Sequence, residues 1–248
     1  MKFGVCCALD EARTILDAGF DYVELSAQGI VANESAYLEI KPEATNLFFS
    51  SDIKLVGPEK TPYHEYAEQV IDAAARVGVQ VMVIGSGGSR RAPDGVEPEQ
   101  GEAAFVRAAA EIAEIGERVG ITIAPESLNQ GETNVGNDLR VLATELQAVG
   151  VCYTADAYHV LAEWAFAGNE ASPTIDDWRD QIPHLPAHVH IASRGRWAPQ
   201  SEDSDLAGFV ARLSELGYDD RVSLEAKRKP GEDWTHVLIN LKTLFGAA

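Results

Sequence analysis

Four side chains with metal-binding chemistry recur along the second half of the chain at nearly equal spacing. They are Glu126, Asp156, His190 and Glu225, which are 30, 34 and 35 residues apart. One eighth of the 248 residues is 31, so in an eightfold repeat these side chains come from the same level of successive units. Three carboxylates and one imidazole form an oxygen-rich ligand set, which suits Mn²⁺, Mg²⁺ or Co²⁺ better than structural zinc, and Zn²⁺ stays open.

Each acidic residue taken alone has a simpler explanation, because a carboxylate after a strand is often a solvated loop residue or a helix N-cap. Four such groups at a common level are harder to explain in that way. If the units form a barrel, their strand ends converge at one mouth, where barrels of this kind hold their active sites. The spacing therefore predicts one divalent metal ion bound by all four residues.

The elements that must position these residues are visible as short apolar runs, each followed by a stretch with helical periodicity. The alternation predicts an α/β fold, a (β/α)8 TIM barrel forming a single domain over residues 1–248. The predicted strands are Lys2 to Cys6, Asp21 to Leu25, Asn46 to Ser50, Val79 to Ile84, Gly120 to Pro125, Val151 to Ala155, Ala187 to Ile191 and Arg221 to Leu224. The clearest predicted helices are Tyr66 to Val77, Gly101 to Val119, Asp138 to Ala148 and Asp205 to Leu216, and Glu34 to Ile40 is the least defined.

A doubly wound open sheet is the alternative arrangement of repeated βα units. A dinucleotide-binding sheet would have a glycine-rich turn after its first strand, but here that strand continues as Cys6-Cys7-Ala8-Leu9-Asp10. The glycine-rich segment, Gly85 to Ser89, follows the fourth predicted strand, and we interpret it as an active-site loop. Arg90 and Arg91 come next. We expect them to form salt bridges in that loop, with contact to a phosphate as the alternative.

Composition narrows the range of partners. Lys plus Arg number 20 against 39 Asp plus Glu, for a formal net charge of -19, which repels polyanions and argues against nucleic acid. The sequence has neither the features of a signal peptide nor a long apolar span, so we expect no membrane partner and a cytoplasmic location. Cys6 and Cys7 are adjacent and Cys152 falls in a predicted buried strand, which fits reduced thiols.

Several motifs together resemble the xylose-isomerase-like barrel superfamily, in particular its sugar isomerase and epimerase branch. The resemblance spans nearly the whole chain. Its motifs are Asp156-Ala-Tyr-His159 after the sixth predicted strand, His188-Val-His-Ile-Ala-Ser193 on the seventh, Ser223-Leu-Glu225 on the eighth, and Val83 to Arg91 around the fourth.

The resemblance implies that the four ligands hold the metal ion, with Mn²⁺ expected first, and that Glu126 and Glu225 also act as the acid and base. The reaction would be isomerisation or epimerisation of a keto-sugar by proton transfer at the carbon next to the carbonyl, through a metal-stabilised enediolate. His159 and Arg196 would hold substrate oxygens.

Two further residues are candidates for substrate binding from their positions alone. Glu24 ends the second predicted strand, where its side chain either lines the pocket or forms a structural hydrogen bond. Trp197 offers a flat surface for stacking on a sugar, although a loop tryptophan also packs against neighbouring elements. His188 should face the same side as His190, two residues away, and we interpret it as a core histidine deeper in the barrel.

Other functions stay open. The same deprotonation could expel a leaving group, which would make the protein a dehydratase or lyase acting on a keto-sugar or keto-glycoside. A barrel that binds a sugar without catalysis is the non-enzymatic alternative. An enzyme of the endonuclease IV type would need further histidine ligands and a cationic face, and neither is expected here. The sequence leaves open whether the protein is a homo-oligomer.

Overall fold

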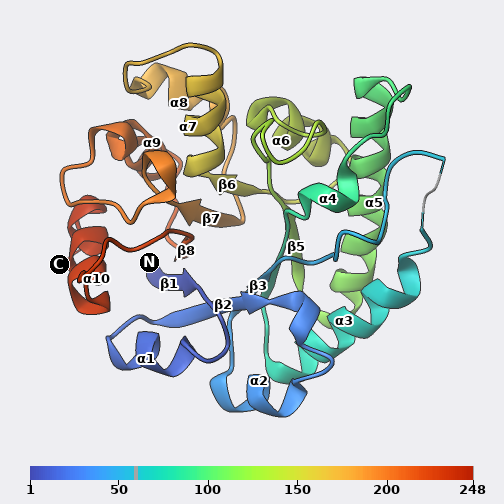
Figure 1. The fold of residues 1–248 in the computed structure, drawn as a ribbon, viewed down its shortest axis with the longest axis horizontal. Helices are drawn as coiled ribbons and strands as arrows, with labels where there is room; N and C mark the ends of the chain where they lie inside the picture. Colours follow the sequence, from blue (N-terminus) through green and yellow to red (C-terminus); the bar gives the residue numbers. More distant parts are fainter. Residues whose placement is uncertain (59–60, 248) are drawn as a thin grey trace.

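The computed structural model of the protein describes residues 1–58 and 61–247. Eight parallel strands form one sheet in the order β5-β4-β3-β2-β1-β8-β7-β6, and helices surround it (Figure 1). This arrangement confirms the predicted (β/α)8 barrel. The strands are β1 (Lys2–Cys6), β2 (Tyr22–Ser26), β3 (Ala44–Asn46), β4 (Val81–Ile84), β5 (Thr122–Pro125), β6 (Thr154–Asp156), β7 (His188–Ile191) and β8 (Arg221–Leu224).

The helices follow the strands along the chain, and those with the clearest predicted periodicity are present. The α-helices are α1 (Ala12–Asp17), α2 (Glu34–Ile40), α3 (His64–Val77), α4 (Gly87–Arg90), α5 (Pro98–Val119), α6 (Leu139–Ala148), α7 (Ala157–Phe166), α8 (Ile175–Gln181), α9 (Ser204–Glu215) and α10 (Trp234–Leu244), and the short 3₁₀ helices are η1 (Ala27–Gly29) and η2 (Arg194–Arg196). Gly78 and Gly120 follow α3 and α5 in the left-handed conformation, where glycine ends a helix without steric cost.

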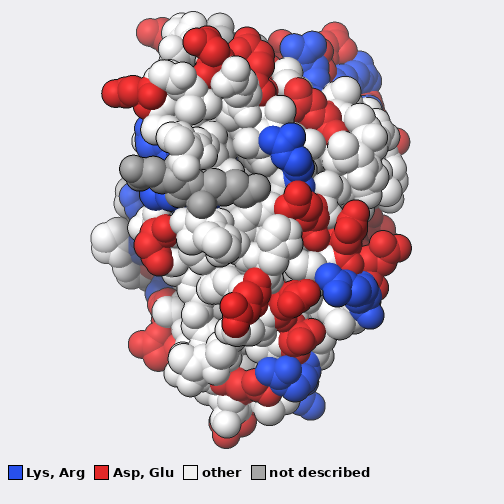
Figure 2. Space-filling view, turned by 90° about the vertical axis from the view of Figure 1, so that its right-hand side faces the viewer, with Lys and Arg blue, Asp and Glu red and all other residues white. Residues whose placement is uncertain are grey.

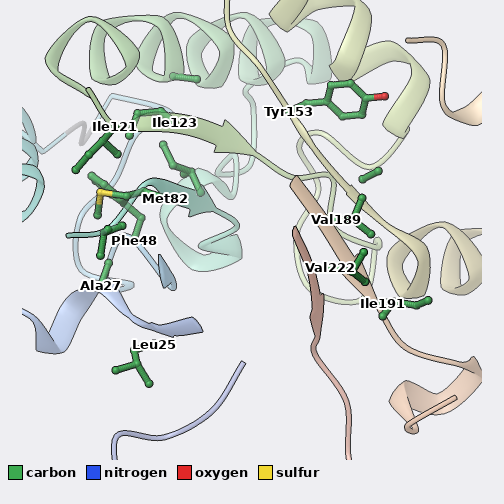
Figure 3. Close-up of a cluster of buried hydrophobic side chains, with 14 of the residues drawn as sticks. Leu25, Ala27, Phe48, Met82, Ile121, Ile123, Tyr153, Val189, Ile191 and Val222 are labelled. Carbon is green, nitrogen blue, oxygen red and sulfur yellow. The ribbon is translucent and has the colours of Figure 1, made fainter. Parts of the chain in front are cut away.

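Strand alternation creates the outer core of the barrel. Val23 and Leu25 on β2 and Val189 and Ile191 on β7 belong to one large hydrophobic cluster, part of which is drawn in Figure 3. The residues between them on the same strands point the opposite way, because successive side chains of a strand lie on opposite faces. The inward positions are therefore left for the groups that build the site.

Inside the barrel, the layer below the site is filled by one large ring among small residues. Tyr22 packs in a separate cluster with Ala44 and Ala124. Gly4 lies on β1 beside it, and a β-carbon at that position would lie 2.4 Å from the ring of Tyr22. Glycine is thus required on β1 so that the tyrosine can occupy the interior.

The barrel closes between β5 and β6, the two ends of the sheet. The backbone contact there is a single parallel bridge between Glu126 and Thr154. The hydroxyl of Thr154 also donates a hydrogen bond of 2.9 Å to the carbonyl oxygen of Ala124. The position that closes the barrel is therefore the same one that carries the first predicted metal ligand.

Two predicted strands are displaced. The third lies at Ala44–Asn46 instead of Asn46 to Ser50, because the buried Phe48 and Phe49 pack from the loop after the strand and continue its apolar run. The sixth begins at Thr154 instead of Val151. Cys152 therefore lies before the strand and is exposed, so the prediction that it is buried in a strand is wrong.

In the part of the chain that the structure describes, the acidic side chains on the molecular surface are dispersed and do not form one patch on the face shown in Figure 2. Figure 2 shows the side of the molecule at the right of Figure 1, where acidic side chains are spread among scattered basic ones. On this face the described residues form no continuous basic patch of the kind that binds nucleic acid. Within residues 1–58 and 61–247, no helix combines the length and apolar character needed to cross a membrane.

Candidate metal centre

The barrel brings the four predicted ligands to one place. Glu126 directly follows β5, Asp156 ends β6, His190 lies in β7 and Glu225 directly follows β8. One ligand atom from each lies within 4.8 Å of the others. The Nδ1 atom of His190 is 3.1 Å from Glu126 Oε2, 3.3 Å from Glu225 Oε2 and 3.7 Å from Asp156 Oδ2.

The donor atoms that face the common point fit a bound cation. Within the described chain, Glu126 Oε2, His190 Nδ1 and Glu225 Oε2 are buried and have no hydrogen-bond partner of acceptable geometry. Buried polar atoms are rarely left unpaired, because desolvation without a partner is costly. Three unpaired ligand atoms aimed at one point fit a metal ion, and their chemistry suits a hard divalent cation.

Asp156 uses one carboxylate oxygen as a helix cap and turns the other toward the cluster. Its Oδ1 accepts a 3.2 Å hydrogen bond from the backbone N–H of His159 and caps the start of α7. Its Oδ2 faces His190 in the cluster. The cap fixes the carboxylate plane, so the second oxygen is held toward the common point.

Electrostatics at the site favour positive charge. Burial by itself would lower the pKa of His190, but Glu24 and other neighbours raise it well above the usual range. Burial raises the pKa of Asp156, yet His159, His190 and Arg196 bring it below its ordinary value. The pKa of Glu126 is raised, first by burial and then by the nearby carboxylates of Glu225 and Asp156, although His190 opposes this rise.

A second group of metal-ligating atoms shares one member with the first. Cys6, Glu24 and His190 each offer an atom within 4.8 Å of the others. Both oxygens of Glu24, however, already accept hydrogen bonds, from His190 on one side and from His188 and Ser223 on the other. We therefore interpret this group as a buried hydrogen-bond network and not as a second metal site.

His159 is held through Nδ1, while its Nε2 lies 3.7 Å from Asp156 Oδ2. Its Nδ1 accepts from the backbone N–H of Asn129 at 3.1 Å, and the side-chain amide nitrogen of Asn129 lies 2.9 Å away. The orientation of that amide is fixed because its oxygen accepts from the backbone N–H of Gly131. The ring hydrogen therefore sits on Nε2, which is buried and lacks a hydrogen-bond partner among the described residues.

Arg196 contacts the cluster through Glu225. Its guanidinium pairs with Glu225 and, at 3.3 Å, with Glu132, and it lies over the ring of Tyr158 with 4.9 Å to the centroid. Burial opposes the charge of Arg196, but Glu225, Asp156 and Glu132 raise its pKa above the ordinary value. Its backbone is in the left-handed region, with φ of 64°, a costly conformation for a non-glycine residue that is common at functional sites.

A cavity of about 550 Å³ opens beside the cluster at the barrel mouth. The residues that line it include Glu225, Arg196, Asn46 and Leu47. A cavity of this size can hold a small ligand next to the metal-ligating atoms.

Two of the predicted substrate-binding residues have other positions. Glu24 is fully buried below the cluster and does not line the cavity at the mouth. Trp197 is 40% exposed, and its backbone bridges to Ser193 and Lys227, while its ring is outside the lining of that cavity. His188 is buried, as expected of a core histidine, and its pKa is lowered by burial.

Sequence reasoning missed three residues of the site. Asn129 and Glu132 lie in the loop that follows Glu126, where they contact His159 and Arg196. In the sequence, only their position in the loop after a barrel strand pointed to the site, because such loops carry active-site groups. Arg90, expected to form a salt bridge, is instead buried and donates a 2.7 Å hydrogen bond to the carbonyl oxygen of Glu126.

The salt-bridge prediction for the pair of arginines in the loop is wrong. Arg90 has no acidic partner within salt-bridge distance in the described part of the chain, and its guanidinium lies 4.6 Å from the centroid of the Phe105 ring. Arg91 donates to the carbonyl oxygen of Glu132. The loop is folded inward, so Arg90 holds the backbone of Glu126 through a buried hydrogen bond.

Fold and site together define a class: (β/α)8 barrels with a cluster of three carboxylates and one imidazole at the mouth. A family model described as xylose isomerase-like TIM barrel matches residues 12–244. The chain belongs to this family, and the resemblance inferred from the motifs is confirmed. No curated protein sequence matches the chain significantly.

Solved structures share the fold across the whole chain. A D-psicose 3-epimerase determined in the presence of D-fructose is 17% identical, with a TM-score of 0.81, and the match covers 99% of this chain and 100% of that one. The 3-keto-D-glucoside 4-epimerase YcjR from E. coli is 20% identical, with a TM-score of 0.72 and 98% of each chain covered. The IOLI protein with a bound zinc atom is 17% identical, with a TM-score of 0.61 and 100% and 96% covered.

Proposed function

We propose that the protein is a divalent-metal-dependent isomerase or epimerase that acts on a keto-sugar by moving a proton at the carbon next to the carbonyl. The observation that carries the proposal is the convergence of Glu126, Asp156, His190 and Glu225, whose ligand atoms lie within 4.8 Å of one another beside a cavity at the barrel mouth. We propose these four residues as the metal ligands.

A divalent ion in that position would polarise a carbonyl and its neighbouring hydroxyl and stabilise the negative charge that develops when the adjacent carbon loses its proton. Glu126 and Glu225 are the proposed proton carriers, because each directs Oε2 at the common point from a different strand end. A carboxylate on each side of a carbon can remove a proton from one face and return it to the other.

The remaining groups of the mouth would hold the substrate. His159 Nε2–H has no hydrogen-bond partner among the described residues and lies 3.7 Å from Asp156 Oδ2, and Arg196 lines the cavity, so both can donate to sugar oxygens. Glu132 accepts from Arg196 at 3.3 Å and would keep that guanidinium in place. Trp197 has no proposed role in this arrangement.

The similar structures support the class of substrate. Their printed names include a D-psicose 3-epimerase, a 3-keto-D-glucoside 4-epimerase and an L-ribulose 3-epimerase. We propose a small ketose or keto-glycoside as the substrate of this protein. Mn²⁺ as the preferred ion and a cytoplasmic location stay predictions.

The test measures metal and proton exchange on the same protein. Metal-depleted protein is titrated with Mn²⁺ by calorimetry, and a panel of D-psicose, D-fructose, D-tagatose and L-ribulose is then followed in deuterium oxide by NMR. We expect one ion per chain and metal-dependent deuterium incorporation next to the carbonyl of one or more sugars. Failure to bind a divalent ion contradicts the metal centre, metal binding without exchange indicates a binding barrel, and a product that has lost water indicates a lyase.

A further inference from the structure

One carboxylate beneath the metal centre is outside the ligand set. Glu24, on β2, is fully buried inside the barrel. Its Oε1 is 2.9 Å from His190 Nε2, while its Oε2 is 2.8 Å from His188 Nε2 and 2.6 Å from Ser223 Oγ. A charge this deep requires hydrogen-bond partners, and β7 and β8 supply all three.

The direction of these hydrogen bonds follows from the chemistry of the groups. Two imidazole nitrogens and one hydroxyl surround the oxygens of Glu24, and an environment made of hydrogen-bond donors favours the ionised form of a buried carboxyl group. An ionised carboxylate only accepts hydrogen bonds. The hydrogen between Glu24 and His190 therefore belongs to Nε2 of His190.

The same reasoning extends the network away from the metal centre. Ser223 uses its single hydroxyl hydrogen toward Glu24. Tyr22, whose hydroxyl oxygen is 2.8 Å from Ser223 Oγ, is thus the donor to Ser223. Glu24 is held by three fixed partners from two strands, and it cannot turn toward the cavity without leaving buried donors unpaired.

Fixing Nε2 also fixes the other ring nitrogen. With Nε2–H directed at Glu24, the ring presents Nδ1 to Glu126 at 3.1 Å and to Glu225 at 3.3 Å. A metal-binding histidine commonly gives its second N–H to a carboxylate, which sets the ring orientation and strengthens the lone pair on the ligating nitrogen.

We propose that Glu24 is the positioning residue of the metal centre: it accepts Nε2–H of His190 and thereby directs Nδ1 at the bound ion. The inference rests on the metal site proposed above. Glu24 lines neither the cavity nor the ligand cluster, so it acts on the ion through His190 and has no direct contact with substrate.

The test compares Glu24→Gln with the wild-type protein. Oε2 accepts from two donors and Oε1 from one nitrogen donor, so glutamine keeps its oxygen toward His188 and Ser223 and presents an N–H to His190. We expect the Nε2–H signal of His190 in ¹⁵N–¹H NMR of the metal-free wild type, and its loss in the variant. Mn²⁺ affinity, measured by calorimetry, should fall about 10- to 100-fold, with an unchanged circular dichroism spectrum.

Ser223→Ala is the matched control, because it removes a contact of the Glu24 carboxylate without touching its bond to His190. This control should retain the Nε2–H signal and bind Mn²⁺ within about threefold of wild type. A Glu24→Gln protein with the wild-type ring signal and wild-type affinity would overturn the inference. If that variant does not fold, a wild-type His190 without hydrogen on Nε2 overturns it equally well. If the wild-type protein binds no Mn²⁺, the proposed function is wrong. The Nε2–H signal of His190 is a separate measurement, and it still shows whether His190 donates a hydrogen bond to Glu24.

Discussion

Gly85 and Glu126 are packed so closely that a β-carbon at position 85 would lie 2.1 Å from Oε1 of the glutamate. Gly85 directly follows β4 and Glu126 directly follows β5, so neighbouring strand ends meet here. Real β-carbons do not come so close to another atom, and the side chain of Glu126 would have to move if one were present. The glycine-rich segment therefore contributes to the site by leaving space, without contributing a ligand.

Gly85→Ala should displace Glu126 and weaken both metal binding and turnover. A shift of about 1 Å at a reacting group costs about 100-fold in rate, and we expect a loss of that order in metal-dependent deuterium exchange. Gly88→Ala is the control on the same loop, since its β-carbon would meet only Ser51, at 3.0 Å. Equal activity of the two variants would show that Glu126 does not need the space at position 85.

Glu126→Gln and Glu225→Gln should each remove turnover while leaving the fold intact. An amide cannot take up a proton as a carboxylate does, and loss of a general acid or base costs about 10²- to 10⁴-fold. The measurement is the exchange rate of the best sugar, with circular dichroism as the check on folding. Glu215→Gln, which changes a glutamate on α9 paired with Arg179, should keep the wild-type rate; a Glu126→Gln protein that does the same would refute the acid–base assignment.

Arg90→Lys should destabilise the barrel near β5. The guanidinium is buried, donates to the carbonyl oxygen of Glu126 at 2.7 Å and lies over Phe105, and lysine reproduces neither the planar stacking nor the donor geometry. We expect a loss of about 1–3 kcal/mol in the free energy of unfolding, measured with urea. The neighbouring Arg91→Lys changes an exposed side chain and should cost under about 1 kcal/mol, so an equal effect at both positions would contradict the buried role of Arg90.

Cys7 should be alkylated much more slowly in the folded protein than an ordinary cysteine at the same pH. Burial, followed by the carboxylates of Glu11 and Glu24, raises the pKa of its thiol to about 12. Because only the thiolate is alkylated, roughly one molecule in a thousand is reactive at pH 9. Iodoacetamide labelling of Cys7 at pH 9, read by mass spectrometry, should be at least about 100-fold slower in the folded protein than in urea.

The exposed Cys152 serves as an internal reference for that experiment. It should label well before Cys7 in the folded protein, and the two should label at similar rates after unfolding. Rapid labelling of Cys7 in the folded state at pH 9 would show that its thiol is not buried among carboxylates.

The sequence by itself determined the repeat and the composition of the site. Apolar runs alternate with helical stretches because each strand is covered by a helix, and this periodicity does not depend on distant contacts. The even spacing of Glu126, Asp156, His190 and Glu225 reflects the same repeat, so the clustering of these four side chains could be predicted before any geometry was known. Of the two displaced strands, β3 was predicted too far along the chain because Phe48 and Phe49 are buried although they lie in the loop after it. A local apolar pattern does not distinguish such a buried loop from a strand.

Only the tertiary structure decided what each remaining side chain does. Glu24 and His190 are 166 residues apart, and their hydrogen bond exists because β2 and β7 face each other across the barrel interior. Arg90 was expected to form a salt bridge in its loop, but the loop after β4 folds against β5 and buries the guanidinium. The spacing of residues in the sequence shows which residues occupy the same position in successive βα units. Which side chains meet across the closed barrel depends on the curvature of the sheet and on the alternation of inward and outward positions.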